Sequence, residues 1–113
     1  MAVPKRQGSE AEDRAAEYLL SQGFSLVTRR YRTRLGEIDI VAMDGDILVF
    51  VEVKNRPEGV MPEMSIDDRK IHRLWIAAQQ YLRDFALVER PFRFDVVAIE
   101  AQEIRHLRDV FID

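Results

Sequence analysis

Two runs of alternating apolar and charged residues, at positions 36–42 and 48–54, constrain the fold of this chain more than any other feature. They are joined by a short segment that contains Asp44-Gly45. Asp-Gly between two alternating runs is typical of a β-hairpin, because a type I′ turn needs positive φ at both central residues. The sequence therefore predicts two antiparallel strands with charged residues inside them.

The register of this hairpin sorts its side chains into two faces. With Asp44 and Gly45 as the turn, Met43 pairs with Asp46, and side chains directly opposite share a face. Alternation then places an entirely apolar set on one face: Ile38, Ile40, Ala42, Ile47, Val49, Val51 and Val53. The other face is apolar near the turn and charged at its far end, with Glu37, Asp39, Val41, Leu48, Phe50, Glu52 and Lys54. In this register Asp39 and Glu52 are diagonal neighbours, roughly 7–8 Å apart.

Two carboxylates that lie this close repel each other unless a cation sits between them. A site with few, hard oxygen ligands suits magnesium, which keeps several waters and takes the rest of its ligands from one or two carboxylates and a phosphate. The alternative is that Glu37, Asp39, Glu52 and Lys54 are solvated or salt-bridged residues on a half-exposed face. Their grouping on one face of a Val/Ile/Phe-rich hairpin favours a site.

An acid on one strand, followed by Glu-x-Lys near the end of the next, resembles the PD-(D/E)xK nuclease superfamily. Within it, the sequences at positions 36–39, 50–54 and 93–97 closely resemble the YraN-like family of bacterial proteins, which are related to archaeal Holliday-junction resolvases. The similarity runs from Glu12 to Phe111. Ile38 replaces the usual proline before the aspartate, and Ala11 replaces the glycine that usually precedes the helical glutamate.

The resemblance implies an α/β fold with a restriction-endonuclease-like αβββαβ core, in which helices flank a mixed four- to five-stranded sheet. It also implies a metal-dependent nuclease that hydrolyses phosphodiester bonds in DNA, including branched or recombination and repair intermediates, with Mg²⁺ or Mn²⁺. Asp39, Glu52 and the backbone carbonyl of Val53 would bind the metal. Lys54 would orient or deprotonate the attacking water, and Glu12 would be the helical acid beside them. Either role of Lys54 is compatible with its chemistry.

Length and composition indicate the number of domains and the class of protein. With 113 residues, of which 47% are apolar, the sequence predicts one domain over residues 1–113, with a flexible start at 1–8 and a mobile loop at 55–65. The absence of cysteine excludes disulfides and thiolate metal sites. No apolar run is long enough for a membrane span or a secretion signal, so a cytoplasmic protein that does not bind membranes is expected.

The formal net charge of −3 argues against tight, nonspecific coating of nucleic acid. Four arginines nevertheless surround Tyr31 at positions 29–34, and of these Arg30, Arg32 and Arg34 are the predicted phosphate contacts. A solvated turn is an equally good interpretation. Lys70 resembles a basic residue of the family and is a further candidate contact, although ordinary solvation of a helix is the stronger alternative.

The remaining elements follow from local signals. A helix from Ser9 to about Gln22 should end at Gly23, with Glu12 at the border of its buried side, and a strand should follow at 24–31. A second helix, starting near Ser65, should bury a stripe of Ile71, Leu74, Trp75, Ala78, Tyr81, Leu82 and Phe85. A strand at 92–99 should lie parallel to the second hairpin strand, and the tail at 104–112 suits an edge strand. Asp95, which alternates with Arg93 and Val97, fits a cross-strand salt bridge at the start of this strand better than a metal site.

Two functions remain open: a metal-dependent nuclease, or a catalytically weak nucleic-acid-binding or scaffolding protein that keeps the nuclease fold. DNA is favoured over RNA as the nucleic acid. Because a symmetric junction requires two active sites, a homodimer or a protein partner is an additional expectation. Neither His72 nor His106 has a Cys or a second His at ligand spacing, which argues against zinc.

Overall fold

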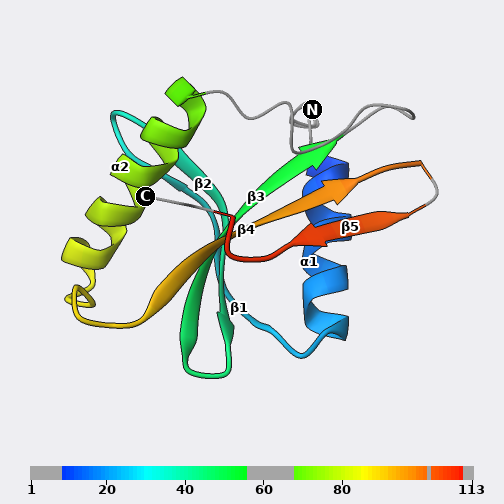
Figure 1. The fold of residues 1–113 in the computed structure, drawn as a ribbon, viewed down its shortest axis with the longest axis horizontal. Helices are drawn as coiled ribbons and strands as arrows, with labels where there is room; N and C mark the ends of the chain where they lie inside the picture. Colours follow the sequence, from blue (N-terminus) through cyan, green and yellow to red (C-terminus); the bar gives the residue numbers. More distant parts are fainter. Residues whose placement is uncertain (1–8, 56–67, 102, 111–113) are drawn as a thin grey trace, which may run out of the picture.

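The computed structural model describes residues 9–55, 68–101 and 103–110, which form a five-stranded sheet with a helix on each face (Figure 1). The elements, in chain order, are α1 (Ser9–Ser21), β1 (Ser25–Arg32), β2 (Glu37–Asp44), β3 (Ile47–Asn55), α2 (Asp68–Asp84), β4 (Phe92–Ile99) and β5 (Ile104–Leu107). This confirms the predicted mixed α/β class, and it is consistent with a restriction-endonuclease-like core. β5 is the predicted edge strand. β3 includes Asn55, the first residue of the predicted loop; positions 56–65 of that loop and residues 1–8 lie outside the described residues.

The strands lie in the order β1-β2-β3-β4-β5. β3 and β4 are parallel, whereas the other neighbouring pairs are antiparallel. A parallel pair needs a crossover connection, and α2 is the helix that lies between these two strands in the chain. The predicted arrangement, a three-stranded meander followed by a helical crossover, is therefore confirmed.

The end of α1 shows how a local signal fixes a boundary. The amide of Phe24 donates to the carbonyl of Leu19 at 3.0 Å, and the amide of Gly23 donates to that of Leu20 at 3.0 Å. These two bonds, with a φ of +94° at Gly23, form a Schellman motif. Phe24 is buried in the core, and the first strand begins at Ser25, one residue later than predicted.

The predicted turn of the hairpin was wrong by one residue. Asp44 pairs with Ile47 and Met43 pairs with Leu48, so Gly45 and Asp46 form the turn. Only Gly45 of these two has a positive φ, +61°, which is the geometry of a type II′ turn with glycine at its first central position. The correction moves the register by two residues, and side chains alternate with a period of two, so the faces of β3 stay as predicted.

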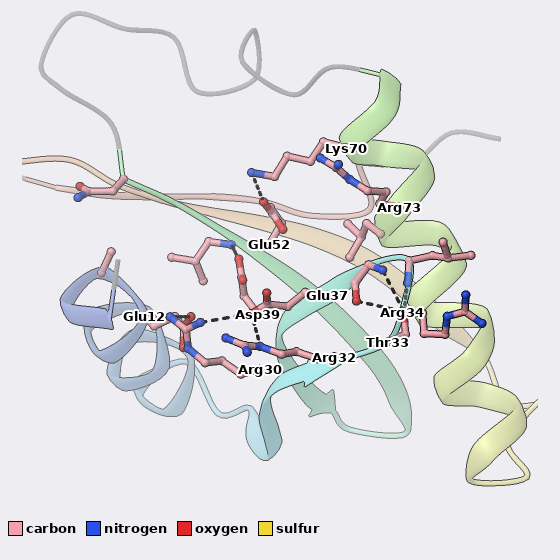
Figure 2. A pocket seen from close by; sticks show the side chains of 16 residues that line it. Glu12, Arg30, Arg32, Thr33, Arg34, Glu37, Asp39, Glu52, Lys70 and Arg73 are labelled. Carbon is pink, nitrogen blue, oxygen red and sulfur yellow. Dashed lines mark hydrogen bonds and ion pairs between the residues drawn. The ribbon is translucent and has the colours of Figure 1, made fainter. Parts of the chain in front are cut away.

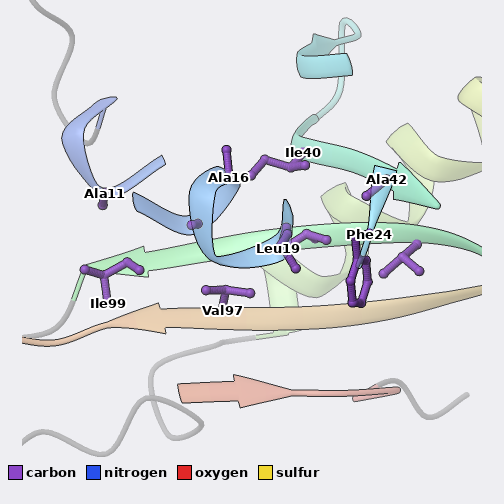
Figure 3. Close-up of a cluster of buried hydrophobic side chains, with 11 residues drawn as sticks. Ala11, Ala16, Leu19, Phe24, Ile40, Ala42, Val97 and Ile99 are labelled. Atoms are coloured by element: carbon purple, nitrogen blue, oxygen red, sulfur yellow. The ribbon is translucent and has the colours of Figure 1, made fainter. Parts of the chain in front are cut away.

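Two apolar cores lie on opposite faces of the sheet. The core under α1 contains eleven buried residues, among them Leu19, Ile40 and Val97 (Figure 3). The core under α2 is built around Phe50 and Leu82, and it also contains Ile38, which was predicted to share a face with Ile40. The paired ladder between β2 and β3 ends at Ile40, and the strict alternation of β2 does not continue past that point.

α2 buries only part of its predicted stripe. Leu74, Ala78, Tyr81 and Leu82 are buried, as expected. Trp75 and Phe85 were predicted to be core residues, but they are 43% and 55% exposed. They lie at the border of the stripe, where each packs against a buried ring, Phe94 and Tyr81 respectively. The predicted start of this helix at Ser65 lies outside the described residues.

Candidate functional site

A pocket of about 630 Å³ lies between α1, α2 and the adjoining ends of β2 and β3 (Figure 2). Its acidic lining residues are Glu12, Glu37, Asp39 and Glu52, and its basic ones are Arg30, Arg32, Arg34, Lys70 and Arg73. Val53 also lines it. Of the predicted site residues, only Lys54 does not line the pocket. The structure thus brings nearly the whole predicted set together from α1, three strands and α2.

Asp39 lies at the point where β2 stops pairing with β3. Its Oδ2 accepts a hydrogen bond of 2.8 Å from the amide of Val53. The side chain of Asp39 thus satisfies an amide of β3 beyond the last backbone pair between β2 and β3. Burial and the neighbouring Glu52 raise the pKa of Asp39 to about 7. A cation beside the two carboxylates would favour the ionised form of Asp39.

Glu52 is buried and contacts two lysines. Its Oε2 lies 2.9 Å from Nζ of Lys70 and 3.3 Å from Nζ of Lys54. Burial and the contact with Lys70 lower the pKa of Lys54, although Glu52 acts in the opposite direction. Burial alone would also lower the pKa of Lys70, but contacts with Lys54 and Glu52 outweigh it and raise that pKa. Lys54 is therefore the lysine of this pair that deprotonates more easily.

Glu12 and Glu37 are connected by Arg30. One guanidinium nitrogen of Arg30 lies 3.0 Å from Oε2 of Glu12, and another lies 3.3 Å from Oε2 of Glu37. Arg29 adds a contact of 3.4 Å to Glu12, which is 4% exposed. Arg30, a predicted phosphate contact, thus has its charge engaged by two acids. Glu37 pairs with two arginines of this cluster, Arg30 and Arg32.

The outer rim of the pocket carries cations that are less engaged. Arg32 is 57% exposed in its side chain and lies 3.8 Å from Glu37, a loose contact. Arg34 and Arg73 line the pocket, and within the described ranges neither forms an ion pair. Arg73 was missing from the predicted site. Its spacing from Lys70, i and i+3 on one helix, places both residues on the same face and would have indicated it.

The donor set fits a hard divalent cation with few protein ligands. In the part of the chain that the structure describes, no three side chains of the types His, Cys, Asp and Glu gather closely enough to hold a metal. Asp39 and Glu52 lie on neighbouring strands, and continuing the observed register by one step places them directly opposite each other rather than diagonally. Two carboxylates and a backbone carbonyl are the kind of ligand set that magnesium accepts while keeping several waters.

Asp95 belongs to a separate buried network. Its carboxylate is fully buried and accepts bonds from Arg93 at 2.9 Å and from Nε2 of His106 at 2.8 Å. A salt bridge is therefore present, but Arg93 lies on the same strand as Asp95, and the partner across the strands is His106. The hydroxyl of Tyr18 lies 3.0 Å from Nδ1 of the same histidine and ties α1 to β5.

The fold and the pocket define a small mixed α/β protein with buried carboxylates between two helices and a sheet, surrounded by basic side chains. The chain belongs to the uncharacterised protein family UPF0102, whose model matches residues 11–99. This range includes every lining residue of the pocket. The YraN-like resemblance is consistent with this membership.

Relatives in several bacteria share the family over nearly their full length. A UPF0102 protein of Lachnoclostridium phytofermentans is 46% identical over 110 residues, which cover 95% of this chain and 93% of the relative. One of Halorhodospira halophila is 43% identical, over 96% of this chain and 88% of the relative. One of Kosmotoga olearia is 41% identical, over 93% and 92% respectively. None of the helices in the described ranges is long and apolar enough to cross a membrane.

Proposed function

We propose that this protein is a metal-dependent nuclease of the PD-(D/E)xK superfamily that hydrolyses phosphodiester bonds in DNA. The observation that carries the proposal is the convergence of Asp39 and Glu52, from two paired strands, in a pocket that is also lined by arginine and lysine side chains. Acids that bind a cation and bases that bind phosphates are both needed for this reaction, and here they share one pocket.

Asp39, Glu52 and the carbonyl of Val53 would hold Mg²⁺ or Mn²⁺. A bound divalent ion can neutralise the non-bridging oxygens, lower the pKa of a water and stabilise the leaving alkoxide. The raised pKa of Asp39 supports this role, because burial and the neighbouring Glu52 disfavour the ionised carboxylate and a bound cation would stabilise it.

Lys54 and Lys70 would have different roles in the reaction. Lys54, whose pKa is lowered, is suited to accept or position the proton of the attacking water. Lys70, which lines the pocket and whose pKa is raised, is suited to hold the phosphate that is cleaved. Glu12, fixed by Arg30, would orient water or the metal's outer ligands.

A second candidate function is a nucleic-acid-binding or scaffolding protein with little turnover. The observation that favours it is the contact of both Lys54 and Lys70 with Oε2 of Glu52, which occupies the lysines and one oxygen of a proposed metal ligand. In the nuclease, metal binding must loosen these contacts. In the binding protein, they would persist.

The test is cleavage of labelled single strands, duplexes, flaps and four-way junctions with Mg²⁺ or Mn²⁺. The native protein should cleave at least one of these substrates, and Asp39→Ala or Lys54→Ala should reduce the rate by at least about 100-fold, within the range of general acid–base effects. Asp46→Ala is the matched control, because Asp46 is exposed in the hairpin turn.

Three results would contradict the proposal or redirect it. Cleavage that survives both site substitutions would come from a contaminant. Binding of DNA by the native protein without cleavage of any substrate would favour the scaffolding function. Loss of activity in Asp46→Ala would indicate general misfolding rather than loss of a catalytic group.

A further inference from the structure

We propose that the turn at residues 33–36 and Arg73 form a second contact with the substrate, which selects DNA with an unstacked base beside the cleaved bond. In this contact Leu35 packs against the base and Arg73 binds an adjacent phosphate. The inference rests on the proposed function, which it extends to the class of DNA structure that is recognised.

The turn between β1 and β2 is held by four short hydrogen bonds. The amide and the hydroxyl of Thr33 both donate to the carbonyl of Gly36, at 2.8 Å and 3.1 Å. The same hydroxyl oxygen accepts from the amides of Leu35 and Gly36, at 3.1 Å and 2.9 Å. Side-chain bonds of this kind stabilise a turn without help from a longer ladder. The tip is thus a defined structure at the edge of the pocket.

The turn is also fixed against α2. A Cβ added to Gly36 would lie 2.2 Å from the backbone carbonyl oxygen of Arg73, a distance at which backbone must shift. Glycine is needed here because it lets the two backbones approach closely. The turn and the first part of α2 therefore form one rigid rim, so the positions of Leu35 and Arg73 depend on each other.

Leu35 is 60% exposed and lines the pocket. Single exposed leucines are common on protein surfaces. This one differs because it sits between Arg34 and the tightly fixed Gly36, in a pocket that Arg32 and Arg73 also line. An apolar side chain on a rigid support, next to cations, is the type of group that packs against an unstacked base while phosphates bind nearby.

Arg73 supplies the cation for such a phosphate. Figure 2 shows it on α2 together with Lys70, on the side of the pocket opposite Arg30 and Arg32. Lys70 contacts Glu52 and Arg30 contacts Glu12, whereas Arg73 is exposed and makes no ion pair with any described residue. Its planar guanidinium can form two parallel hydrogen bonds to one phosphate.

A paired, stacked duplex does not present a base face to Leu35, whereas the unpaired bases of a flap or a fork do. Unstacking a paired base costs energy, and this cost is smallest at a mismatch or an unpaired end. The rim therefore favours branched or frayed DNA through one apolar contact and one phosphate contact. No base-specific hydrogen bond is required.

The experiment uses a flap DNA that carries 2-aminopurine as its first unpaired base, and a fully paired duplex of the same length. The protein carries Asp39→Ala so that the DNA stays intact. Binding to the flap should change the fluorescence of 2-aminopurine, and adding Leu35→Ala should abolish most of that change and weaken flap binding about ten-fold, the size expected for loss of a leucine contact. Duplex affinity should change less than about two-fold, since the leucine contact is absent there.

Matched controls separate the contact from general effects. Leu20→Ala removes a leucine that is 54% exposed on α1 and should leave flap binding and fluorescence unchanged. Arg73→Ala should weaken flap binding about ten-fold, as expected for loss of a charged hydrogen bond, and Arg69→Ala, an exposed arginine on the same helix, should not.

The outcomes distinguish this inference from the proposed function. If Leu35→Ala keeps the fluorescence change, or weakens flap and duplex binding equally, the base contact does not exist even though the nuclease function can stand. If the native chain neither binds nor cleaves any DNA, the proposed function fails and the base contact fails with it. A native protein that cleaves duplex and flap at equal rates, and loses nothing in Leu35→Ala, would also overturn the inference.

Discussion

At Asp39, the stability of the fold and the proposed binding of a cation favour different side chains. It is buried beside Glu52, and it accepts the amide hydrogen of Val53. A residue chosen for stability alone would be neutral here. A negative charge in this place is useful when a cation must be bound.

This conflict gives a testable dependence of stability on pH. The pKa of Asp39 is about 7 in the folded protein, against about 3.9 in an unfolded chain, so the folded state binds more protons between these values. The contribution of Asp39 to the free energy of unfolding therefore falls as pH rises from about 4 to about 7. Asp39→Asn should match the native protein at pH 4 and exceed its stability at pH 8 by roughly 2–4 kcal/mol, measured by urea unfolding without metal.

Magnesium provides the control for this prediction. Millimolar Mg²⁺ should raise the melting temperature of the native protein at pH 8, because an ion that binds only the folded state stabilises it. It should leave Asp39→Asn unchanged. Parallel pH profiles for the two proteins without metal would contradict the assignment of the high pKa to Asp39.

At the scale of elements, the network around Asp95 joins β4 and β5 to α1. The carboxylate accepts from Arg93, His106 and the amide of Asp109, the last at 3.0 Å. Burial would raise the pKa of Asp95, but the bonds from His106 and Arg93 outweigh it and lower that pKa. Because the ionised carboxylate can only accept, Nε2 of His106 is the donor and its Nδ1 faces the hydroxyl of Tyr18.

Asp95→Asn should therefore destabilise the protein by about 3–5 kcal/mol, the cost of removing one member of a buried ion pair. The native protein should keep the stabilisation from Asp95 above the unfolded pKa and lose it as pH falls below that value. Hydrogen exchange of the β5 amides should become faster in the variant. Asp109→Asn, at an exposed aspartate whose side chain is outside the network, is the control, and an equal loss in both variants would contradict the argument.

Elements with local signals were predictable from the sequence. Gly23 marks the end of α1, and Pro91 precedes a strand whose observed range, Phe92–Ile99, is the predicted one. The hairpin was harder, since a turn centred on 44–45 and one centred on 45–46 both place glycine at a central position. Both turns leave Asp39 and Glu52 on neighbouring strands near the same end, which is why the acidic part of the site was predicted.

The rest of the site depends on packing between distant elements. The position at which α2 crosses the sheet decides two features of the site. It decides whether Lys54 lines the pocket or lies buried, and whether Arg73 reaches the rim. The periodicity of α2 indicates a buried stripe but not how far the stripe extends, so Trp75 was assigned to the core. Ile38 was assigned to the wrong face because the alternation of β2 does not continue beyond Ile40.

At the scale of the whole molecule, the formal charge of the pocket lining is opposite in sign to the net charge of the chain. The chain carries a formal charge of −3, with 17 basic and 20 acidic residues. Among the described residues the pocket is lined by five basic and four acidic side chains, so it carries a small formal excess of positive charge where DNA is proposed to bind. An acidic surface elsewhere would keep nucleic acid from binding outside this pocket.

The small number of rim cations predicts a weak dependence of DNA binding on salt. If Lys70, Arg32, Arg34 and Arg73 are the main phosphate contacts, the slope of log K against log [salt] should be about −3 to −4, since each contact contributes roughly −0.7 to −0.9. Fluorescence anisotropy over a range of KCl concentrations would measure it for the Asp39→Ala protein. A slope steeper than about −6 would require a basic surface beyond this pocket.

The turn at Gly45 and Asp46 offers a practical handle for such measurements. From Ile47, β3 reaches Glu52 after five further residues, so the turn lies roughly 17 Å from that end of the strand. Asp46 is exposed, and a Cβ on Gly45 would meet nothing within 4 Å. Since the sequence contains no cysteine, one cysteine introduced at Asp46 would carry a fluorophore or a surface tether at a single defined place, with the DNA-facing side left open.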